Sequence, residues 1–199
     1  MPHSPFILAT RGSALARAQA NTILAQCQNA FPQLNFQIKI IKTTGDKLQT
    51  ASLASANLPK GLFTKELELA LLNGEADLAI HSLKDLPTDL PAGLRLGAVS
   101  QRADARDVLI YRADSTALSG SKAGFKPHLK ISDLPIGATI ATSSTRRSAY
   151  LLEQRSDLKI VPIRGNVPTR LKKLAQQFDI DAIILALAGL ILLRSPAGK

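Results

Sequence analysis

The stretch FILATRGSALARAQANTILAQCQNAF (6–31) decides the fold class of this 199-residue chain. Its opening residues, FILAT (6–10), form an apolar run with the length of a buried strand, and RGS (11–13) predicts a turn. The apolar spacing of the remainder predicts a helix over 14–31, with Ser13 placed to cap it. A strand, a turn and a helix in this order are the building unit of α/β sheets, so we predict an α/β protein.

Similar units follow along the rest of the chain. Apolar runs and alternating patterns predict strands at 36–42, 76–82, 94–100, 107–112, 138–144 and 158–165, and helices at 61–75, 145–156 and 166–178. Thr64 is expected to cap the helix over 61–75, and Gly74 to end it. Residues 181–190 complete a second α/β set, whereas 43–47 predict a glycine-containing turn and 113–130 a surface loop.

Length and composition allow two small domains. With 45% hydrophobic residues, each half of the chain has enough apolar material for a buried core. The junction QRADAR (101–106) separates two predicted strands. We therefore expect an N-terminal α/β domain over 1–103 and a second α/β domain over 104–199.

The charge of the chain is strongly positive, with a net value of +10. Such an excess attracts polyanions, which raises nucleic acid as a possible partner. The basic residues are dispersed, with no run of five or more, and aromatic residues make up only 4% of the chain, with no Trp. A phosphate-tracking stripe and a base-stacking platform are both missing from this pattern, so nucleic-acid binding ranks last among our hypotheses.

Cysteine usage and the N-terminus bear on the cellular compartment. Cys27 is the only cysteine, which rules out an internal disulfide and a metal site of several thiolates within this sequence. Its place in a predicted amphipathic helix favours a buried, inert thiol. The apolar run near the N-terminus is too short for a signal sequence or a membrane span, so we expect a cytoplasmic protein with no membrane partner.

Arginine and hydroxyl residues gather in turns that follow predicted strands. At a helix N-terminus, free backbone N–H groups and the positive end of the helix dipole favour an anion, to which a nearby arginine adds a bidentate contact. Arg146 and Arg147 stand in a first helical turn, where cations are unfavourable unless an anion is present. The turn residues of this kind are Arg11, Ser13, Thr142, Ser143, Ser144, Arg146, Arg147, Arg164, Gly165 and Arg170. They predict a cleft between the two halves for a small molecule with several carboxylates; the alternative is solvated arginines beside ordinary helix caps.

One segment, HSLKDLPT (81–88), carries the candidate catalytic group. A carboxylate among many cations is ionised, and it can serve a developing positive charge or a protonated amine on a substrate. Asp85 is therefore the catalytic candidate, with Lys84 beside it. The alternative for Asp85 is a structural salt bridge to Lys84 or a nearby arginine, and His81 is more typical of a hydrogen-bonded structural histidine than of a catalyst. No metal site is predicted.

Six segments, in this order, resemble those of the porphobilinogen deaminase family, also called hydroxymethylbilane synthases. They are RGSALARAQ (11–19), KGLFTKELE (60–68), DLAIHSLKDLPT (77–88), TSSTRR (142–147), IRGNVPTRL (163–171) and DAIILALAGL (181–190). The resemblance implies two domains like those of periplasmic binding proteins, with a ligand cleft between them. It also implies a cytoplasmic, monomeric transferase of haem and tetrapyrrole biosynthesis that joins four porphobilinogen units head to tail and releases ammonia at each.

The same resemblance assigns roles to individual residues. Asp85 matches the aspartate that stabilises positively charged pyrrole species and assists proton transfer. The residues matching those that hold the acetate and propionate groups of a dipyrromethane cofactor and of the growing chain are Arg11, Ser13, Lys84, Ser144, Arg146, Arg147, Arg164 and Arg170. Thr142, Ser143 and Gly165 lie within the same matched segments and complete our candidate binding set.

The chain also departs from the family pattern. The resemblance implies that the cofactor is attached to a cysteine in a third, α+β domain, and we expect about 100 residues, a typical domain, to be missing from this chain. Cys27 does not occupy the attachment position, so we expect this chain alone to be impaired or inactive. Smaller departures are Ala141 in place of a usual glycine, Leu192 in place of a usual arginine, and a longer segment at 113–130. The competing hypothesis is a binding module that retains the cleft and captures polycarboxylates without chemistry.

Overall fold

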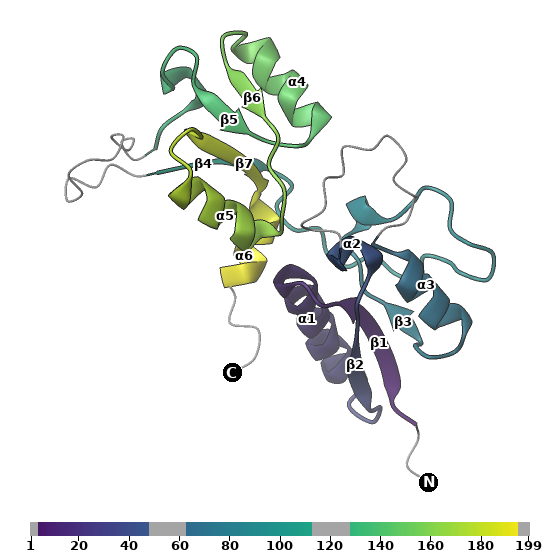
Figure 1. Ribbon diagram of the computed structural model, residues 1–199. Helices are drawn as coiled ribbons and strands as arrows, with labels where there is room; N and C mark the ends of the chain where they lie inside the picture. Colours follow the sequence, from purple (N-terminus) through teal and green to yellow (C-terminus); the bar gives the residue numbers. More distant parts are fainter. Residues whose placement is uncertain (1–3, 48–62, 113–127, 195–199) are drawn as a thin grey trace. The chain divides into compact units, whose positions relative to one another are not determined.

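The computed structural model describes residues 4–47, 63–112 and 128–194 (Figure 1). The chain forms two compact units, one of Met1–Arg102 with Ile191–Lys199 and one of Ala103–Leu190. The first boundary falls after Arg102, one residue before the boundary that we predicted after residue 103. From Ile191 onward the chain is grouped with the first unit again. No helix in the described part of the chain is long and apolar enough to cross a membrane.

The first unit contains a parallel three-stranded sheet in the order β2-β1-β3. Its strands are β1 (Phe6–Arg11), β2 (Phe36–Ile41) and β3 (Leu78–Ala79). The middle strand is the most buried, because Leu8 and Ala9 are fully inaccessible to solvent, and Leu8 pairs with Ile38 on one side and Leu78 on the other. All three strands end at the same edge, so the segments that follow them are brought together there.

Helices cover both faces of this sheet. Helix α3 (Lys65–Leu72) packs through Leu67 on the face that holds Ala9. On the opposite face the Thr10 hydroxyl donates to the Ala16 carbonyl of α1 (Ala14–Ala30) over 3.2 Å. The strand, turn and helix that we predicted over 6–31 are thereby confirmed, and so is the Ser13 cap, whose hydroxyl accepts a hydrogen bond from the Ala16 N–H.

The second unit has a mixed four-stranded sheet in the order β4-β7-β5-β6. Its strands are β4 (Asp107–Tyr111), β5 (Thr139–Ala141), β6 (Lys159–Val161) and β7 (Ala182–Ala186). Strands β5, β6 and β7 run parallel, and β4 lies antiparallel at one edge against β7. The parallel pairs and the covering helices confirm the predicted α/β class in this unit as in the first.

The core of the second unit lies on both faces of its sheet. Leu151 of α4 (Thr145–Gln154) packs with Ile140 and Ile184 on one face. Leu174 of α5 (Val167–Gln176) packs with Ile183 on the other face. Ile183 and Ile184 are neighbours on β7 and point to opposite sides, as side chains alternate along a strand. Helix α6 (Leu187–Arg194) follows β7 directly.

Several predicted elements are shorter than expected, or absent. The segment 94–100 forms no strand, and its apolar side chains Leu96 and Val99 are 50% and 63% exposed. Its alternating pattern suits a strand, but it has no ladder partner among the described residues. The turn predicted at 43–47 is instead a one-turn helix, α2 (Thr44–Lys47). Of the loop predicted at 113–130, residues 113–127 lie outside the described part.

Helix α3 also begins differently from the prediction. Thr64 occupies the cap position, but its backbone is helical and its hydroxyl makes no capping hydrogen bond. The Thr64 side chain is buried, and its oxygen has no hydrogen-bond partner among the described residues. Gly74 stands just after the helix with a φ of 70°, as predicted for the residue that ends it. Residues 61 and 62 of the predicted helix lie outside the described part.

Candidate functional site

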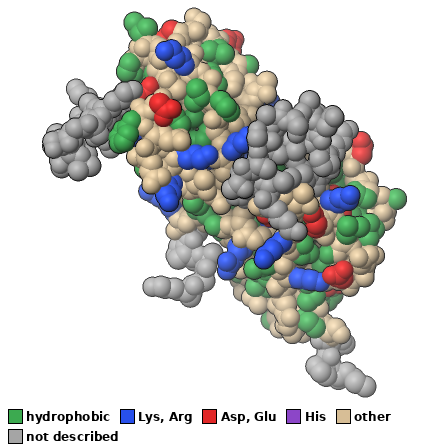
Figure 2. All heavy atoms as spheres, viewed as in Figure 1, with side chains coloured by type: hydrophobic (Ala, Val, Ile, Leu, Met, Phe, Trp, Pro, Cys, Tyr) green, Lys and Arg blue, Asp and Glu red, His purple; other side chains and the backbone are tan. Residues whose placement is uncertain are grey.

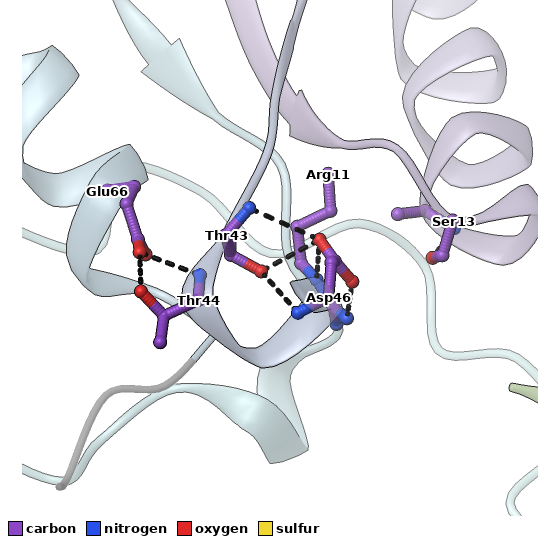
Figure 3. A network of polar contacts seen from close by, with 7 residues as sticks. Arg11, Ser13, Thr43, Thr44, Asp46 and Glu66 are labelled. Atoms are coloured by element: carbon purple, nitrogen blue, oxygen red, sulfur yellow. Dashed lines mark hydrogen bonds and ion pairs between the residues drawn. The ribbon is translucent and has the colours of Figure 1, made fainter. Parts of the chain in front are cut away.

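In the first unit, Arg11 ends β1 and turns its guanidinium toward Asp46 (Figure 3). Arg11 Nη2 lies 2.5 Å from Asp46 Oδ1, and both side chains are less than one-fifth exposed. The Thr43 hydroxyl donates to the same carboxylate over 2.7 Å, and the guanidinium carbon lies 4.1 Å from the centre of the Phe63 ring. Arg11 is thus held by a carboxylate on one side and an aromatic ring on another.

The charge of Asp46 follows from these contacts. Burial alone would raise the pKa of its carboxyl group, but the hydrogen bonds from Arg11 and Thr43 and the charge of Arg11 together hold it below the usual value. Asp46 is therefore ionised at neutral pH and compensates the positive charge of Arg11. The sequence prediction missed this partner because Asp46 lies in a segment interpreted only as a turn.

Ser13 is the N-cap residue of α1 and follows Arg11 closely in the chain (Figure 3). Its hydroxyl oxygen accepts the Ala16 N–H over 3.3 Å, so the oxygen serves the helix. The hydroxyl hydrogen is still available to donate to an anion, because a serine hydroxyl can accept and donate at once. Capping and ligand binding are therefore compatible roles for this residue.

Asp85 and Lys84 lie in η2 (Leu83–Asp85), a single turn of 3-10 helix that follows β3. Both side chains are exposed. The Asp85 N–H donates to the Ser82 carbonyl over 2.8 Å and closes the turn. Neither Lys84 nor any arginine of the described residues lies within 4.0 Å of the Asp85 carboxylate, so the salt bridge to Lys84 or a nearby arginine that we weighed as its alternative role is absent from this part of the chain.

His81 is half-buried between charged groups of the first unit. Its pKa is lowered mainly by burial, with an opposing effect of Asp85, a further lowering by Arg11 and a raising effect of Glu68. The imidazole is therefore neutral at neutral pH. These interactions also place Asp85, Arg11 and Glu68 in the surroundings of one imidazole, which gives the first unit a mixture of acidic and basic groups at the carboxyl ends of its strands.

In the second unit, Arg147 is also paired with a carboxylate. Its Nε and Nη2 donate to Asp107 over 2.9 and 2.6 Å, and Nη1 donates to the Ile184 carbonyl over 3.3 Å. Arg146, its neighbour in the first turn of α4, is exposed. Asp107 stands at the start of β4, and no local sequence pattern indicates that this residue contacts α4.

The hydroxyl residues before α4 mainly support the local backbone. The Ser144 hydroxyl accepts the Arg147 N–H and caps α4, although at 3.5 Å the bond is long. Ser143 bridges to the chain after β6, donating to the Ile163 carbonyl over 2.7 Å and accepting its N–H over 3.0 Å. The buried Thr142 hydroxyl accepts the Ser144 N–H over 3.2 Å. These contacts fix the turn that presents the two arginines.

Arg170 differs from Arg11 and Arg147 in its surroundings. Its side chain is half-buried, its Nε donates to the Gly165 carbonyl over 2.8 Å, and no carboxylate pairs with it among the described residues. Burial, followed by repulsion from Arg147, lowers the pKa of the guanidinium, which nevertheless stays protonated. A cation placed in this way is stabilised when an anion binds.

The turn before Arg170 depends on a glycine. Gly165 has a φ of +108°, and a Cβ there would lie 2.6 Å from the Thr169 Cγ2 atom. Asn166 then caps α5, accepting the Thr169 N–H over 3.0 Å. Arg164, next to this glycine, is exposed. No acidic residue occupies the first turn of α4 or of α5, so both helix N-termini are free of a resident carboxylate of their own.

The predicted site residues therefore form two groups. Arg11, Ser13, Lys84 and Asp85 gather at the strand ends of the first unit. The second group comprises Thr142, Ser143, Ser144, Arg146, Arg147, Arg164, Gly165 and Arg170. On the face drawn in Figure 2, Lys and Arg side chains form separate spots over both units. Among the described residues, no cluster of His, Cys, Asp or Glu is placed to hold a metal ion.

Comparison with known proteins gives a consistent family match. A family model described as "Porphobilinogen deaminase, dipyromethane cofactor binding domain" matches residues 6–196. The porphobilinogen deaminase of Desulforudis audaxviator is 47% identical over 184 residues, covering 92% of this chain and 54% of that protein. That of Clostridioides difficile is 43% identical over 185 residues, covering 93% and 56%. The chain thus spans about half the length of the curated relatives it matches.

Solved structures give more distant similarities. The BvgS VFT2 domain of Bordetella pertussis is 16% identical with a TM-score of 0.44, covering 94% of this chain and 68% of that one. The OxyR2 regulatory domain from Vibrio vulnificus, in a sulfate-bound form, is also 16% identical with a TM-score of 0.44, covering 96% and 76%.

Proposed function

This chain belongs to the porphobilinogen deaminase family, and on that premise we propose that its two units form the part of a hydroxymethylbilane synthase that binds pyrrole carboxylates. The reaction is the head-to-tail condensation of four porphobilinogen units, with release of one ammonia at each step. It belongs to haem and tetrapyrrole biosynthesis. We also propose a cytoplasmic monomer whose partner is this small-molecule substrate, without nucleic acid or membrane.

The observation that carries the proposal is the state of Arg170. Among the residues that the structure describes, the half-buried Arg170 guanidinium has only a backbone carbonyl as partner and lies near a second arginine, which is unfavourable without an anion. The helix N-termini of α4 and α5 add free N–H groups on the same unit. Acetate and propionate side chains supply anions of the required kind, and the charge of Arg147 adds to the positive field at Arg170.

A dipyrromethane cofactor fits the donor set of the second unit. Its carboxylates would be held by guanidinium and hydroxyl donors, which bind such groups through short, charge-assisted hydrogen bonds. Arg146, Arg164 and Arg170 are the members of the set that no carboxylate of the described chain pairs with. When bound, the cofactor supplies the free pyrrole carbon to which the next unit is added. Within this chain, Cys27 does not match the family's attachment cysteine.

The first unit is proposed to handle positive charge during the reaction. Asp85 is exposed and without a cationic partner within 4.0 Å among the described residues, so it is open to a protonated amine or a positively charged pyrrole. The neutral His81 beside it adds no positive charge that would compete for the carboxylate. Arg11 and Ser13 face a carboxylate of the substrate, with Asp46 and Phe63 holding Arg11 in place.

The direct test is to incubate the purified chain with porphobilinogen and to measure ammonia release and uroporphyrin formation. Intact mass spectrometry of the same sample, looking for added dipyrromethane, reports on cofactor loading. We expect little turnover by the wild-type chain alone, and none by Asp85→Asn. Full turnover by the chain alone would contradict our expectation that it is impaired. Equal turnover by wild type and Asp85→Asn would overturn the role of Asp85.

A second candidate function is carboxylate capture without chemistry. The observation that favours it is that Arg146, Arg164 and Arg170 have no carboxylate partner among the described residues and are open to an anion whether or not a reaction follows. Calorimetry with a synthetic dipyrromethane bearing acetate and propionate groups separates the two candidates. Binding without ammonia release, unaffected by Asp85→Asn and weakened by Arg170→Gln, would favour the binding module.

A further inference from the structure

Gln19 of α1 contacts Ser82, the residue just before η2, across 63 positions of sequence. The Gln19 side-chain amide lies with Nε2 2.9 Å and Oε1 3.1 Å from the Ser82 hydroxyl oxygen. Both residues are half-buried and both belong to the first unit. A side-chain amide offers a donor and an acceptor together, and a hydroxyl can use both, so the contact restrains Ser82 in position and orientation.

Few other hydrogen bonds restrain this part of the chain. Between residues 81 and 100, the other hydrogen bonds of the described residues are local ones: Asp85 to Ser82, Leu86 to Leu83 and Leu94 to Pro91. The turn η2 is only three residues long, and such short 3-10 turns have poor hydrogen-bond geometry. Ser82 stands at the cap position of η2, but its hydroxyl does not cap the turn. The side chain is directed to Gln19 instead.

The Gln19–Ser82 contact continues to the candidate catalytic carboxylate. The Ser82 carbonyl accepts the Asp85 N–H over 2.8 Å, so a restraint on Ser82 is passed to the backbone of Asp85. At its other end, Gln19 is fixed by α1, the helix that Ser13 caps and that follows Arg11. Helix α1 is therefore linked through Gln19 to Ser82 and, through the Ser82 carbonyl, to the backbone of Asp85.

We propose that Gln19 is a positioning residue that holds Asp85 in its reactive place through Ser82. The proposal rests on the proposed function for the role of Asp85, but the restraint itself does not. Gln19 touches neither the substrate nor the reacting atoms in this view. Its amide is neutral, so it orders the turn without changing the charge near Asp85.

Amide hydrogen exchange in the purified chain tests the restraint directly. The variants are Gln19→Ala, Ser82→Ala and the double variant, with Gln28→Ala as the matched control, since Gln28 is an exposed residue of the same helix. NMR follows exchange of the Asp85 and Leu86 amides. We expect about tenfold faster exchange in each single variant, the size of one lost hydrogen bond, and no further increase in the double variant. Ser82→Thr, which keeps the hydroxyl, should retain most of the protection.

Kinetics then separate positioning from a merely structural contact. Where the chain converts porphobilinogen, Gln19→Ala and Ser82→Ala should lower kcat about tenfold and leave KM within about twofold, because only the placement of Asp85 changes. Unchanged exchange in both single variants, or lost protection with an unchanged kcat, would overturn the proposal. A wild-type chain without turnover is the impairment that we expect of the chain alone, and the exchange result then decides the positioning. Failure of the wild-type chain to bind a synthetic dipyrromethane in calorimetry would count against the proposed function alone. Thermal unfolding of every variant checks that the fold is intact.

Discussion

Arg11 ends strand β1, and Arg170 lies in the first turn of α5, the helix that follows β6, yet the surroundings of the two arginines differ. Arg11 is paired with Asp46 and covered by Phe63, so its charge is compensated before any ligand arrives. Arg170 has a backbone carbonyl as its partner and Arg147 as a charged neighbour. The same local fold therefore carries opposite electrostatics, with acids mixed among the bases in the first unit and an excess of cations in the second.

The two regions differ in the kind of charge that each one stabilises. A region with Asp85, Asp46 and the neutral His81 suits groups that become positive, such as a leaving amine. A region whose cations outnumber its acids suits carboxylates that stay negative throughout.

The largest effect is expected from adding a methyl group at Gly165, with the same change at Gly12 as the comparison. Gly165→Ala places a side chain at a φ of +108° and 2.6 Å from Thr169, which should lower the free energy of unfolding by about 3 kcal/mol. Gly12 has an ordinary φ, and a Cβ there would lie 3.6 Å from Ile40, so Gly12→Ala should leave stability nearly unchanged. Urea denaturation measures both. Equal losses of unfolding free energy in the two variants would contradict the conclusion that Gly165, and not Gly12, requires a glycine.

The second prediction concerns the compensated pair of the first unit. Asp46→Ala leaves the Arg11 guanidinium mostly shielded from water and without its carboxylate, which should cost about 2 kcal/mol of unfolding free energy. Asp104→Ala serves as the control, because its partner Arg106 is 79% exposed and such pairs contribute little. The measurement is again urea denaturation at neutral pH. A loss of unfolding free energy no larger than that of Asp104→Ala would contradict a structural role for Asp46.

The third prediction compares the two arginines as carboxylate ligands. Arg170→Gln should weaken binding of a dipyrromethane bearing acetate and propionate groups about tenfold, since a charged hydrogen bond is lost. Arg11→Gln should weaken it less, about threefold, because Asp46 already takes part of the guanidinium's hydrogen-bonding capacity. Isothermal titration calorimetry compares the two variants with wild type. The reverse order would contradict the distinction between a compensated and an uncompensated arginine.

The smallest effect is a pH dependence that belongs to the first unit. The pKa of Asp46 is lowered in the folded chain, so its contribution to stability is present above its unfolded value of 3.8 and is lost as pH falls through the lower folded value. In Asp46→Asn this contribution is absent at every pH. The difference in urea midpoint between wild type and Asp46→Asn should therefore shrink between about pH 5 and about pH 3. A difference that stays constant over this range would contradict the assignment.

Local features of the fold could be read from the sequence, and distant partners could not. The strand over 6–10, the helix over 14–31 and the Ser13 cap depend on neighbouring residues and were predicted correctly. Asp46, Asp107 and Gln19 were missed, because each acts on a residue at least 35 positions away and no local pattern reports such a contact. The segment 94–100 shows the converse, since a strand pattern forms a strand only where a partner strand is present.

For the candidate site, the sequence located the arginines and hydroxyls in the turns, but it did not identify the carboxylates that pair with them. Ligand binding by these residues stays a prediction. The arginines and hydroxyls of the turns stand where the strand, turn and helix pattern places them. Whether an arginine is compensated depends on the register between elements, as with Arg147, whose partner Asp107 opens a strand at the sheet edge. Burial of Arg170 and the position of His81 beside Asp85 also follow from tertiary packing.

The antiparallel strand β4 determines the order in which the two units can be completed during synthesis. In the first unit, the three described strands are all present once the chain has reached Ala79. Among the described strands of the second unit, β4 pairs only with β7, with Asp107 opposite Ala186, so β4 cannot pair before β7, the last of them, has been made. Closing such a long loop makes pairing slow. On a ribosome, β4 remains an unpaired, apolar edge until nearly the whole second unit has emerged, which makes this strand the point at which a nascent chain is most exposed to aggregation.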